Sequence, residues 1–367
     1  KNLGMEVKTE IAYTGVVGIL KGNLPGPVVA LRADMDALPV TERVDIPFAS
    51  KVEAEYNNQK VGVMHACGHD THIAILMGVA EVLTAHKQEL RGTVKFIFQP
   101  AEEGPPKGEE GGAKLMVKEG VLSNPEVDVI FGLHINAQTP IGQILYRPGG
   151  VMASADSYHI KVKGKQTHGA YPWGGVDPIV VSAQIVNALQ TIVSRQLPLT
   201  QNPAVISVGS IHGGVRSNII PEEVELIGTI RALDTDMQMS IHKKIEQTAT
   251  LIAESAGATA EVNISIGYPV THNNPELTER MLPSLQAVAG AENVQLRKPV
   301  MGAEDFSFFA QKVPGFFFFL GGAPEGSAAE DTAPHHTPDF FIDEGGLTLG
   351  TKALCRLVID YMQDYKP

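Results

Sequence analysis

The segment Met64-His65-Ala66-Cys67-Gly68-His69-Asp70-Thr71-His72 constrains this chain more than any other. It places three histidines, a cysteine and a carboxylate directly before an apolar run, residues 73–83, that is typical of a helix. Asp70 suits the N-cap of that helix, so we expect Cys67 and His69 in the tight loop that enters it. Thiolate and imidazole are ligands of zinc and similar ions. The alternative is a buried free cysteine beside surface histidines.

The composition is that of an acidic, globular chain long enough for two or three compact units. Hydrophobic residues make up 43% and charged residues 19% of the 367 positions, which is unlike a disordered sequence. The formal net charge of −12 and the lack of a basic stripe argue against nucleic acid or an anionic membrane as a partner. No apolar stretch approaches the ~20 residues that span a bilayer.

The two cysteines, Cys67 and Cys355, are not expected to form a disulfide. Cys67 is expected to act as a thiolate ligand, and Cys355 lies in a pattern of apolar residues that is typical of a helix. This favours a reducing, cytoplasmic location. Residues 1–7 resemble a helix end leading into a strand, so we also expect a preceding segment, which would be compatible with a periplasmic or secreted protein.

Acidic residues follow the second of two predicted strands near the start of the chain. The runs 16–20 and 28–32 are β-branched, and the Gly-Asn-Leu-Pro-Gly-Pro segment between them favours a hairpin. Asp34 and Asp36 come directly after the second run. Open α/β sheets place their ligands at such strand ends. The alternative is an ordinary polar strand exit.

A pair of adjacent glutamates follows the next predicted strand, residues 93–98. Because adjacent side chains cannot point the same way, one of Glu102 and Glu103 can bind a metal while the other reaches a water held there. A second pair, Glu109 and Glu110, lies in a loop and suits the start of the following helix. We prefer the first pair because it is fixed to a strand, and the second remains the alternative.

A histidine, His134, closes the apolar strand predicted over residues 127–134, after a helix over 112–119. It is either a satisfied core residue or one more ligand at a strand end. Strands alternate with helices here, and the candidate ligands and acidic residues lie repeatedly at the carboxyl ends of the predicted strands. This predicts a doubly wound α/β domain with its site along one edge of a mixed sheet.

A second domain is predicted within the chain, over residues 154–267. Strands over 156–163, 205–208, 224–231 and 260–266 and helices over 178–193 and 236–256 occur in the order β-α-β-β-α-β, which is ferredoxin-like. The alternating strands predict a sheet with one face open to solvent or to a partner chain. Residues 1–153 and 268–367 are then the metal-binding catalytic domain, in which 333–340 adds His335 and His336 in a rigid turn.

Eight motifs in order give the sequence a resemblance, along its whole length, to the M20 metallopeptidases. The subfamily it resembles most is that of amidohydrolases such as aminoacylases, hippurate hydrolases and plant hydrolases of auxin–amino acid conjugates. The motifs are Leu31-Arg32-Ala33-Asp34-Met35-Asp36-Ala37-Leu38-Pro39, Met64-His65-Ala66-Cys67-Gly68-His69-Asp70, Gln99-Pro100-Ala101-Glu102-Glu103-Gly104, Phe131-Gly132-Leu133-His134, Gly164-Lys165-Gln166-Thr167-His168-Gly169-Ala170-Tyr171-Pro172, Asn218-Ile219-Ile220-Pro221, Met301-Gly302-Ala303-Glu304-Asp305-Phe306 and His336-Thr337-Pro338.

The resemblance implies a site for two divalent metal ions. Its ligands are implied to be Cys67, His69, Glu103, His134 and His336, one of which bridges the ions. The thiolate favours zinc, and manganese, cobalt and nickel also suit a mixed N, O and S site.

The resemblance also implies roles around the metals. Glu102 is the implied general base, which takes a proton from the metal-bridging water and later delivers it to the leaving amine. Asp36 is implied to orient a ligand. Asp34 stands where other M20 branches have a metal-binding histidine, so its role stays open. The remaining histidines of these motifs are expected to be structural or to support the ligands: His65, His72 and His335.

Three residues of the inserted domain have implied roles toward the substrate. His168 and Asn218 match residues that stabilise the tetrahedral oxyanion. Arg231 matches one that holds the substrate carboxylate, to which its planar fork is suited. The alternative is that these are polar groups on a solvated sheet. The family uses this domain as a lid and dimer interface, so a homodimer is expected, and in some relatives lid residues reach the site of the partner protomer.

These features predict a metal-dependent enzyme that hydrolyses the amide bond of N-acyl-L-amino acids. The alternatives with the same site are a carboxypeptidase or dipeptidase and a deacetylase of an acetylated diamino acid. A zinc-dependent deacetylase of sugars or polyamines would not need Arg231. A non-catalytic, metal-binding dimeric scaffold would have lost Glu102 or a ligand, and neither is lost.

Overall fold

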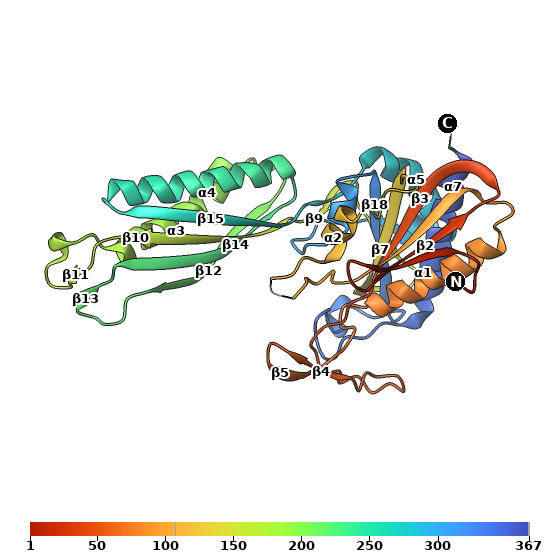
Figure 1. Cartoon of the computed structure of the whole chain (residues 1–367), viewed down its shortest axis with the longest axis horizontal. Coiled ribbons are helices and arrows are strands. Elements are labelled where there is room, and N and C mark those ends of the chain that lie inside the picture. Colours follow the sequence, from red (N-terminus) through yellow and green to blue (C-terminus); the bar gives the residue numbers. More distant parts are fainter. Residues whose placement is uncertain (107, 366–367) are drawn as a thin grey trace. The chain divides into compact units, whose positions relative to one another are not determined.

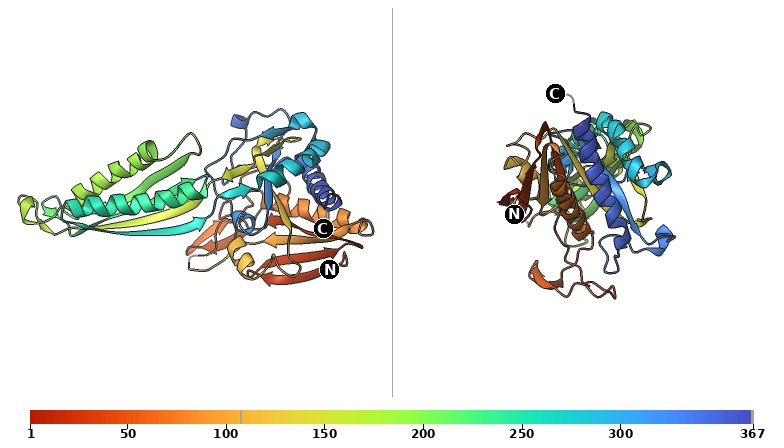
Figure 2. Two further views of the ribbon diagram at one scale, coloured as in Figure 1. Left: turned by 90° about the horizontal axis from the view of Figure 1, so that it is seen from above. Right: turned by 90° about the vertical axis from the view of Figure 1, so that its right-hand side faces the viewer.

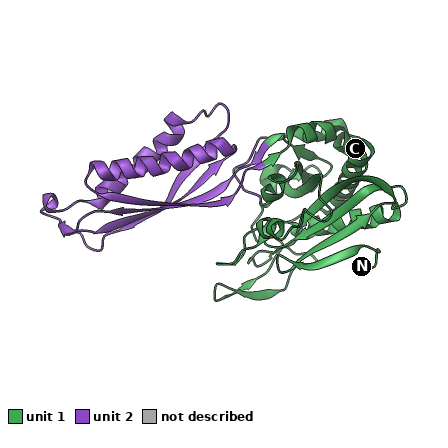
Figure 3. Cartoon of the chain, turned by 45° about the horizontal axis from the view of Figure 1, so that its top comes forward, with its two compact units in different colours: residues 1–149, 272–298, 305–367 green, residues 150–271, 299–304 purple. Residues whose placement is uncertain are grey.

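The structure is a computed structural model that describes residues 1–106 and 108–365, and the chain divides into two compact units (Figures 1 and 3). Unit 1 comprises Lys1–Gly149, His272–Lys298 and Asp305–Pro367, and unit 2 comprises Gly150–Thr271 and Pro299–Glu304. Unit 2 is therefore an insertion into unit 1. Among the described residues, no helix is both long and apolar enough to cross a membrane.

The centre of unit 1 is an eight-stranded mixed sheet with the strand order β1-β2-β6-β3-β7-β18-β8-β17. Strands β6, β3, β7 and β18 are mutually parallel, and β1, β2 and β8 run antiparallel to a neighbour. The bounds are β1 Glu6–Ile11, β2 Gly15–Lys21, β3 Leu24–Asp34, β6 Arg91–Gln99, β7 Val129–Pro140, β8 Ile144–Tyr146, β17 Val294–Leu296 and β18 Gly315–Ala323. A separate hairpin pairs β4 (Glu53–Tyr56) with β5 (Gln59–Gly62).

The predicted hairpin between the first two β-branched runs is wrong. Strands β2 and β3 do form, but β6 lies between them and pairs with both, antiparallel to β2 and parallel to β3. A hydrophobic pattern marks a strand without naming its partner, and burial of β3 in the centre of the sheet outweighs the closeness of the two runs in sequence.

Helices cover both faces of this sheet. Helices α1 (His69–Ala85), α5 (Pro275–Ala289) and α7 (Leu347–Gln363) share one apolar core with alternate strand residues such as Val94 and Phe96, and α1 packs along α7 (Figure 2). Lys95, between those two residues, faces the other side, where its Nζ donates to carbonyls of the loop after α2 (Gly112–Lys118). The short α6 (Ser307–Ala310) contacts α2. The predicted doubly wound α/β architecture is confirmed.

Helix α1 begins earlier than predicted, because Gly68 rather than Asp70 is its N-cap. Gly68 has φ 84°, a left-handed conformation that favours glycine, and a Cβ there would lie 2.4 Å from Ile135 Cγ2. Asp70 instead lies in the first turn, where its negative charge suits the helix dipole.

Unit 2 is a four-stranded antiparallel sheet with the order β12-β14-β10-β15, and helices α3 and α4 pack on one face of it. The elements are β10 Ala155–Lys163, α3 Pro178–Gln196, β12 Ala204–Gly213, β14 Glu223–Ala232, α4 Thr235–Ser255 and β15 Thr259–Tyr268. This is the predicted ferredoxin-like order. A small ladder of β11 (Thr167–His168) with β13 (Ile219–Ile220) adjoins it, and β9 (Gly149–Met152) and β16 (Thr271–Asn273) lie where the chain changes units.

Candidate metal centre

The candidate ligands of unit 1 gather at the carboxyl ends of the three central parallel strands. Asp34 and Gln99 end β3 and β6 and are paired in register, and the pairing of Arg32 with Gly132 places His134 at the same level of β7. Strand β7 continues to Pro140, so the prediction that His134 closes its strand is wrong. The chain leaves β3 through α1 to β6 on one side, then crosses through α2 to β7 on the other. This change of direction is a topological switch point, where open α/β sheets bind their ligands.

Cys67 lies at the centre of one cluster. Its Sγ is 3.4 Å from His134 Nε2 and 3.3 Å from His336 Nε2. The same His336 nitrogen is 2.8 Å from Glu103 Oε1. The turn that carries His336 is joined to the cysteine loop by its backbone N–H, which donates to the Ala66 carbonyl at 2.8 Å. Segments far apart in the chain thus bring sulfur, nitrogen and oxygen donors together.

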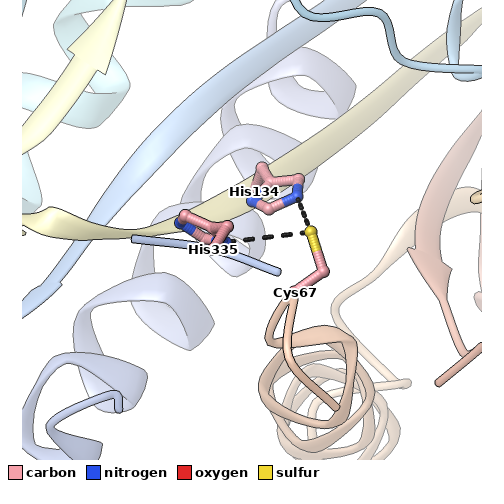
Figure 4. Close-up of side chains that lie close together, drawn as sticks. All are labelled: Cys67, His134 and His335. Atoms are coloured by element: carbon pink, nitrogen blue, oxygen red, sulfur yellow. Dashed lines mark hydrogen bonds between the residues drawn. The ribbon is translucent and has the colours of Figure 1, made fainter. Parts of the chain in front are cut away.

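The two histidines drawn with Cys67 in Figure 4, His134 and His335, have different tautomers. His134 Nδ1 donates to the Ile135 carbonyl at 2.6 Å, which leaves its Nε2 lone pair directed at Cys67. His335 Nε2 accepts the Ala137 N–H at 3.2 Å, so its Nδ1 carries the proton and lies 3.8 Å from Sγ. Burial and neighbouring histidines lower the pKa of His335 to about 4. His134 is arranged as a ligand and His335 as a hydrogen-bond donor to sulfur.

His69 is fully buried, yet neither ring nitrogen makes a hydrogen bond within the described residues. Three carboxylates surround it instead. Nδ1 is 3.4 Å from Asp36 Oδ1, and Nε2 is 3.8 Å from Asp34 Oδ2 and 4.0 Å from Glu102 Oε2. Burial lowers the pKa of His69, but Asp34 and Asp36 outweigh it and raise the value to about 9. Such an imidazole among carboxylates is suited to a cation.

Asp36 fixes the backbone of the glutamate pair. Its two carboxylate oxygens accept the N–H groups of Glu102 and Glu103, each at 2.9 Å. The two glutamate side chains then take different directions. Glu103 reaches His336, while Glu102 is 6% exposed and its Oε1 accepts the Asp305 N–H at 3.4 Å. A shielded carboxylate beside a ligand-bearing one is the arrangement that a general base needs.

The second glutamate pair lies elsewhere. Glu109 and Glu110 are exposed, and Glu110 forms a surface ion pair with Lys118 at 2.5 Å. Among the described residues, neither belongs to a group of side chains close enough together to share a metal ion. The geometry therefore favours Glu102 and Glu103, over Glu109 and Glu110, as the pair that supplies a metal ligand and a general base.

A buried arginine beneath the site was not assigned a role from the sequence. Arg32 is 1% exposed and donates to Gln99 Oε1 at 2.8 Å, Asp34 Oδ2 at 2.6 Å and Asp305 Oδ1 at 2.8 Å. Burial raises the pKa of Asp34, but Arg32 and the nearby histidines hold it well below its usual range. A cation inside an apolar strand run, Val28 to Leu31, was the signal available in the sequence.

His72 has hydrogen-bond partners on both ring nitrogens, and among the described residues His65 belongs to no group of side chains close enough together to share a metal ion. His72 Nε2 accepts the Ile135 N–H at 2.8 Å, so its Nδ1 carries a proton and donates to Asp34. His65 Nδ1 lies 3.1 Å from the Asp36 carbonyl oxygen, an acceptor, so that nitrogen is the donor of this bond. Only the outer nitrogen of His65 stays open, on the far side of the ring. Both residues hold the acidic segment 34–36 in place.

The donor set fits divalent cations. Candidate ligand atoms of Cys67, His69 and Glu103 all lie within 4.8 Å of one another. Those of Cys67, His134 and His335 lie equally close, but the proton on His335 Nδ1 leaves only the cysteine and His134 as ligands in this second group. Burial and the charge of Glu103 raise the pKa of the Cys67 thiol, so a thiolate here needs a cation beside it.

The three expected substrate-binding residues lie in unit 2, at two separate places. His168 in β11 is exposed, and Asn218 is next to its ladder partner, Ile219. Arg231 is half-buried near the other end of β14, where it pairs with Val205. A ten-residue strand such as β14 spans about 30 Å, so one sheet holds two groups that are far apart.

Comparison with known proteins identifies the family of the chain. The model of peptidase family M20/M25/M40 matches residues 30–360. The chain belongs to this family. It is a hydrolase of the metallopeptidase and amidohydrolase class.

Several M20 relatives match nearly the whole chain. Thermostable carboxypeptidase 2 of Saccharolobus solfataricus is 44% identical over 98% of this chain and 88% of its own length. N-acetylcysteine deacetylase of Bacillus subtilis is 36% identical over 96% and 86%, and IAA-amino acid hydrolase ILR1-like 4 of Arabidopsis thaliana is 38% identical over 100% and 80%. The crystal structure of a dinuclear metal-binding M20 peptidase of Bacillus subtilis has a TM-score of 0.80 and 33% identity, covering 99% of this chain and 90% of the other.

Proposed function

We propose that this M20 hydrolase cleaves the amide bond of N-acyl-L-amino acids and releases a carboxylic acid and a free amino acid. The observation that carries the proposal is the buried His69, which makes no side-chain hydrogen bond to any described residue and lies between the Cys67 cluster and the shielded Glu102. Two relatives have names that describe cleavage of an acylated amino acid, N-acetylcysteine deacetylase and IAA-amino acid hydrolase. These names support the substrate class.

Two divalent cations, with zinc favoured by the thiolate, would be held by Cys67, His69, Glu103, His134 and His336. When bound, they would polarise the amide carbonyl and lower the pKa of water.

The side chains around these ligands would then handle the proton and the charge. Glu102 takes a proton from water and delivers it to the leaving amine, because its carboxylate is shielded and held through Asp36. His168 and Asn218 donate to the oxyanion, and Arg231 binds the free carboxylate of the amino acid.

We further infer a homodimer in which the two groups of unit 2 serve different copies of the site. His168 and Asn218 are about a strand length from Arg231, so one substrate cannot reach both groups within one copy of this sheet. A partner copy would supply the missing group.

The test is release of free amino acid from N-acetyl, N-benzoyl and N-indoleacetyl amino acids and from simple dipeptides. We expect cleavage of the N-acyl compounds that stops with chelator and returns with zinc, manganese or cobalt. Cleavage of dipeptides alone would favour the second candidate, a carboxypeptidase, which the 44% identical relative supports by its name. No cleavage with any metal would refute both.

A further inference from the structure

Two large aromatic side chains lie exposed in unit 2 next to His168. Trp173 is 80% exposed and Tyr171 is 57% exposed. Trp173 is also the sole tryptophan of the chain. Exposed aromatic groups of this size generally mark a binding surface, because leaving them in water forfeits the free energy of their burial.

The rings form one connected row. The ring centroids of His168 and Tyr171 are 5.4 Å apart, and those of Tyr171 and Trp173 are 5.6 Å apart at an interplanar angle of 79°. We call these three side chains the aromatic row. The row begins at His168, the proposed oxyanion donor, and continues through the rings of Tyr171 and Trp173.

The backbone holds this row in place without a ligand. Lys165 and Val176 close the loop by exchanging two backbone hydrogen bonds, at 2.9 and 3.0 Å. Inside it, the Tyr171 N–H donates to the His168 carbonyl at 2.8 Å, and the Gly174 N–H donates to the Tyr171 carbonyl at 3.0 Å. Because the backbone of this loop is already held, a ligand that binds here costs little backbone freedom, which favours recognition.

We propose that Tyr171 and Trp173 bind the acyl group of the substrate and select aromatic acyl groups such as benzoyl or indoleacetyl. The inference rests on the proposed function, in which His168 contacts the oxygen of the scissile carbonyl. The acyl group is bonded directly to that carbonyl carbon, whereas the amino-acid side chain is three bonds from it. The rings next to His168 therefore meet the acyl group first, and stacking against them favours a flat aromatic group.

The test compares three substrates that differ only in the acyl group: N-acetyl-, N-benzoyl- and N-indoleacetyl-L-alanine. We expect W173A to lower kcat/KM for the two aromatic substrates about tenfold and to change the N-acetyl value little. W173F keeps a ring and should retain most of the preference. The matched control is L251A, which removes another exposed apolar side chain of unit 2, in α4.

A binding measurement gives an independent readout. In metal-loaded E102A, N-benzoyl-L-alanine should change the fluorescence of Trp173 saturably, and N-acetyl-L-alanine should not. An equal loss for all three substrates in W173A would overturn the inference. If the oligomeric state changed as well, Trp173 would be assigned to a contact between copies. If the wild type cleaves none of them, the proposed function itself fails, which is a different result.

Discussion

Replacing Arg32 by Met tests whether the buried ion network supports the metal centre. The Arg32 and Asp34 side chains are both 0% exposed, and the guanidinium also binds Asp305. Methionine keeps an apolar stem of similar length but leaves two buried carboxylates without this cation. Breaking a buried pair on one side costs about 3–5 kcal/mol, and we expect R32M to lose about 4 kcal/mol of the free energy of unfolding of unit 1.

The matched control is R43M, which breaks a pair of the same chemistry at the surface. Arg43 binds both carboxylate oxygens of Asp339, but these side chains are 62% and 56% exposed. An exposed pair contributes about 0–1 kcal/mol, so R43M should be nearly as stable as the wild type.

The assay is guanidinium unfolding of both variants with chelator present, followed by circular dichroism. If R32M loses no more stability than R43M, the network does not stabilise unit 1 and the reasoning is refuted. The double variant R32M/D34N should lose less free energy of unfolding than R32M alone, because it also removes the Asp34 charge that R32M leaves buried without a partner.

Three further results are expected from the proposed function. E102A should lose turnover but still bind metal by stoichiometry, whereas E110A should keep full activity; the reverse result would move the base to the second glutamate pair. R231A should lose most of its kcat/KM, by roughly 10²-fold or more, for free-carboxylate substrates and little for their methyl esters, since the lost contact is a charge-assisted fork worth several kcal/mol. Mixing inactive E102A with inactive H168A should restore up to about a quarter of wild-type activity, because a mixed dimer keeps one site with an intact Glu102 and a His168 supplied by the partner; a mixture that stays inactive would contradict the supply of His168 by the partner.

The sequence predicts the fold well where periodicity decides the answer. The six elements predicted for unit 2 all occur, in the predicted order, because amphipathic helices and half-buried alternating strands each carry their own period. Strand pairing in unit 1 is not predicted in this way. Strand β6 lies between β2 and β3 and pairs with both, and the hydrophobic patterns of these strands do not say which strand is the neighbour of which. The hairpin prediction fails for this reason.

The candidate site divides in the same way. The residue types and their place after predicted strands or before a predicted helix are visible in the sequence, and they mark Cys67, the Glu102 and Glu103 pair and His134 as candidates. The end of β7 is not visible, since this strand continues past His134 to Pro140. The buried contact from Arg32 to Asp305 joins positions 273 residues apart, and no local pattern predicts such a pair. Tautomers are likewise set by partners such as backbone N–H groups, which is why the distinction between the two adjacent histidines 335 and 336 needs coordinates.

The backbone conformation of the ligand-bearing loops is a further feature that the residue types do not predict. Each of three ligand-bearing loops contains a residue with positive φ: Gly68 at 84°, Ala101 at 54° and His336 at 64°. For the alanine and the histidine this costs about 1–2 kcal/mol each. Hydrogen bonds hold both in place, since Asp36 binds the two N–H groups that follow Ala101, and the His336 N–H binds the Ala66 carbonyl. Backbone strain is thus present at two places where side chains must converge on one point, as expected when the position of a donor atom matters more than local stability.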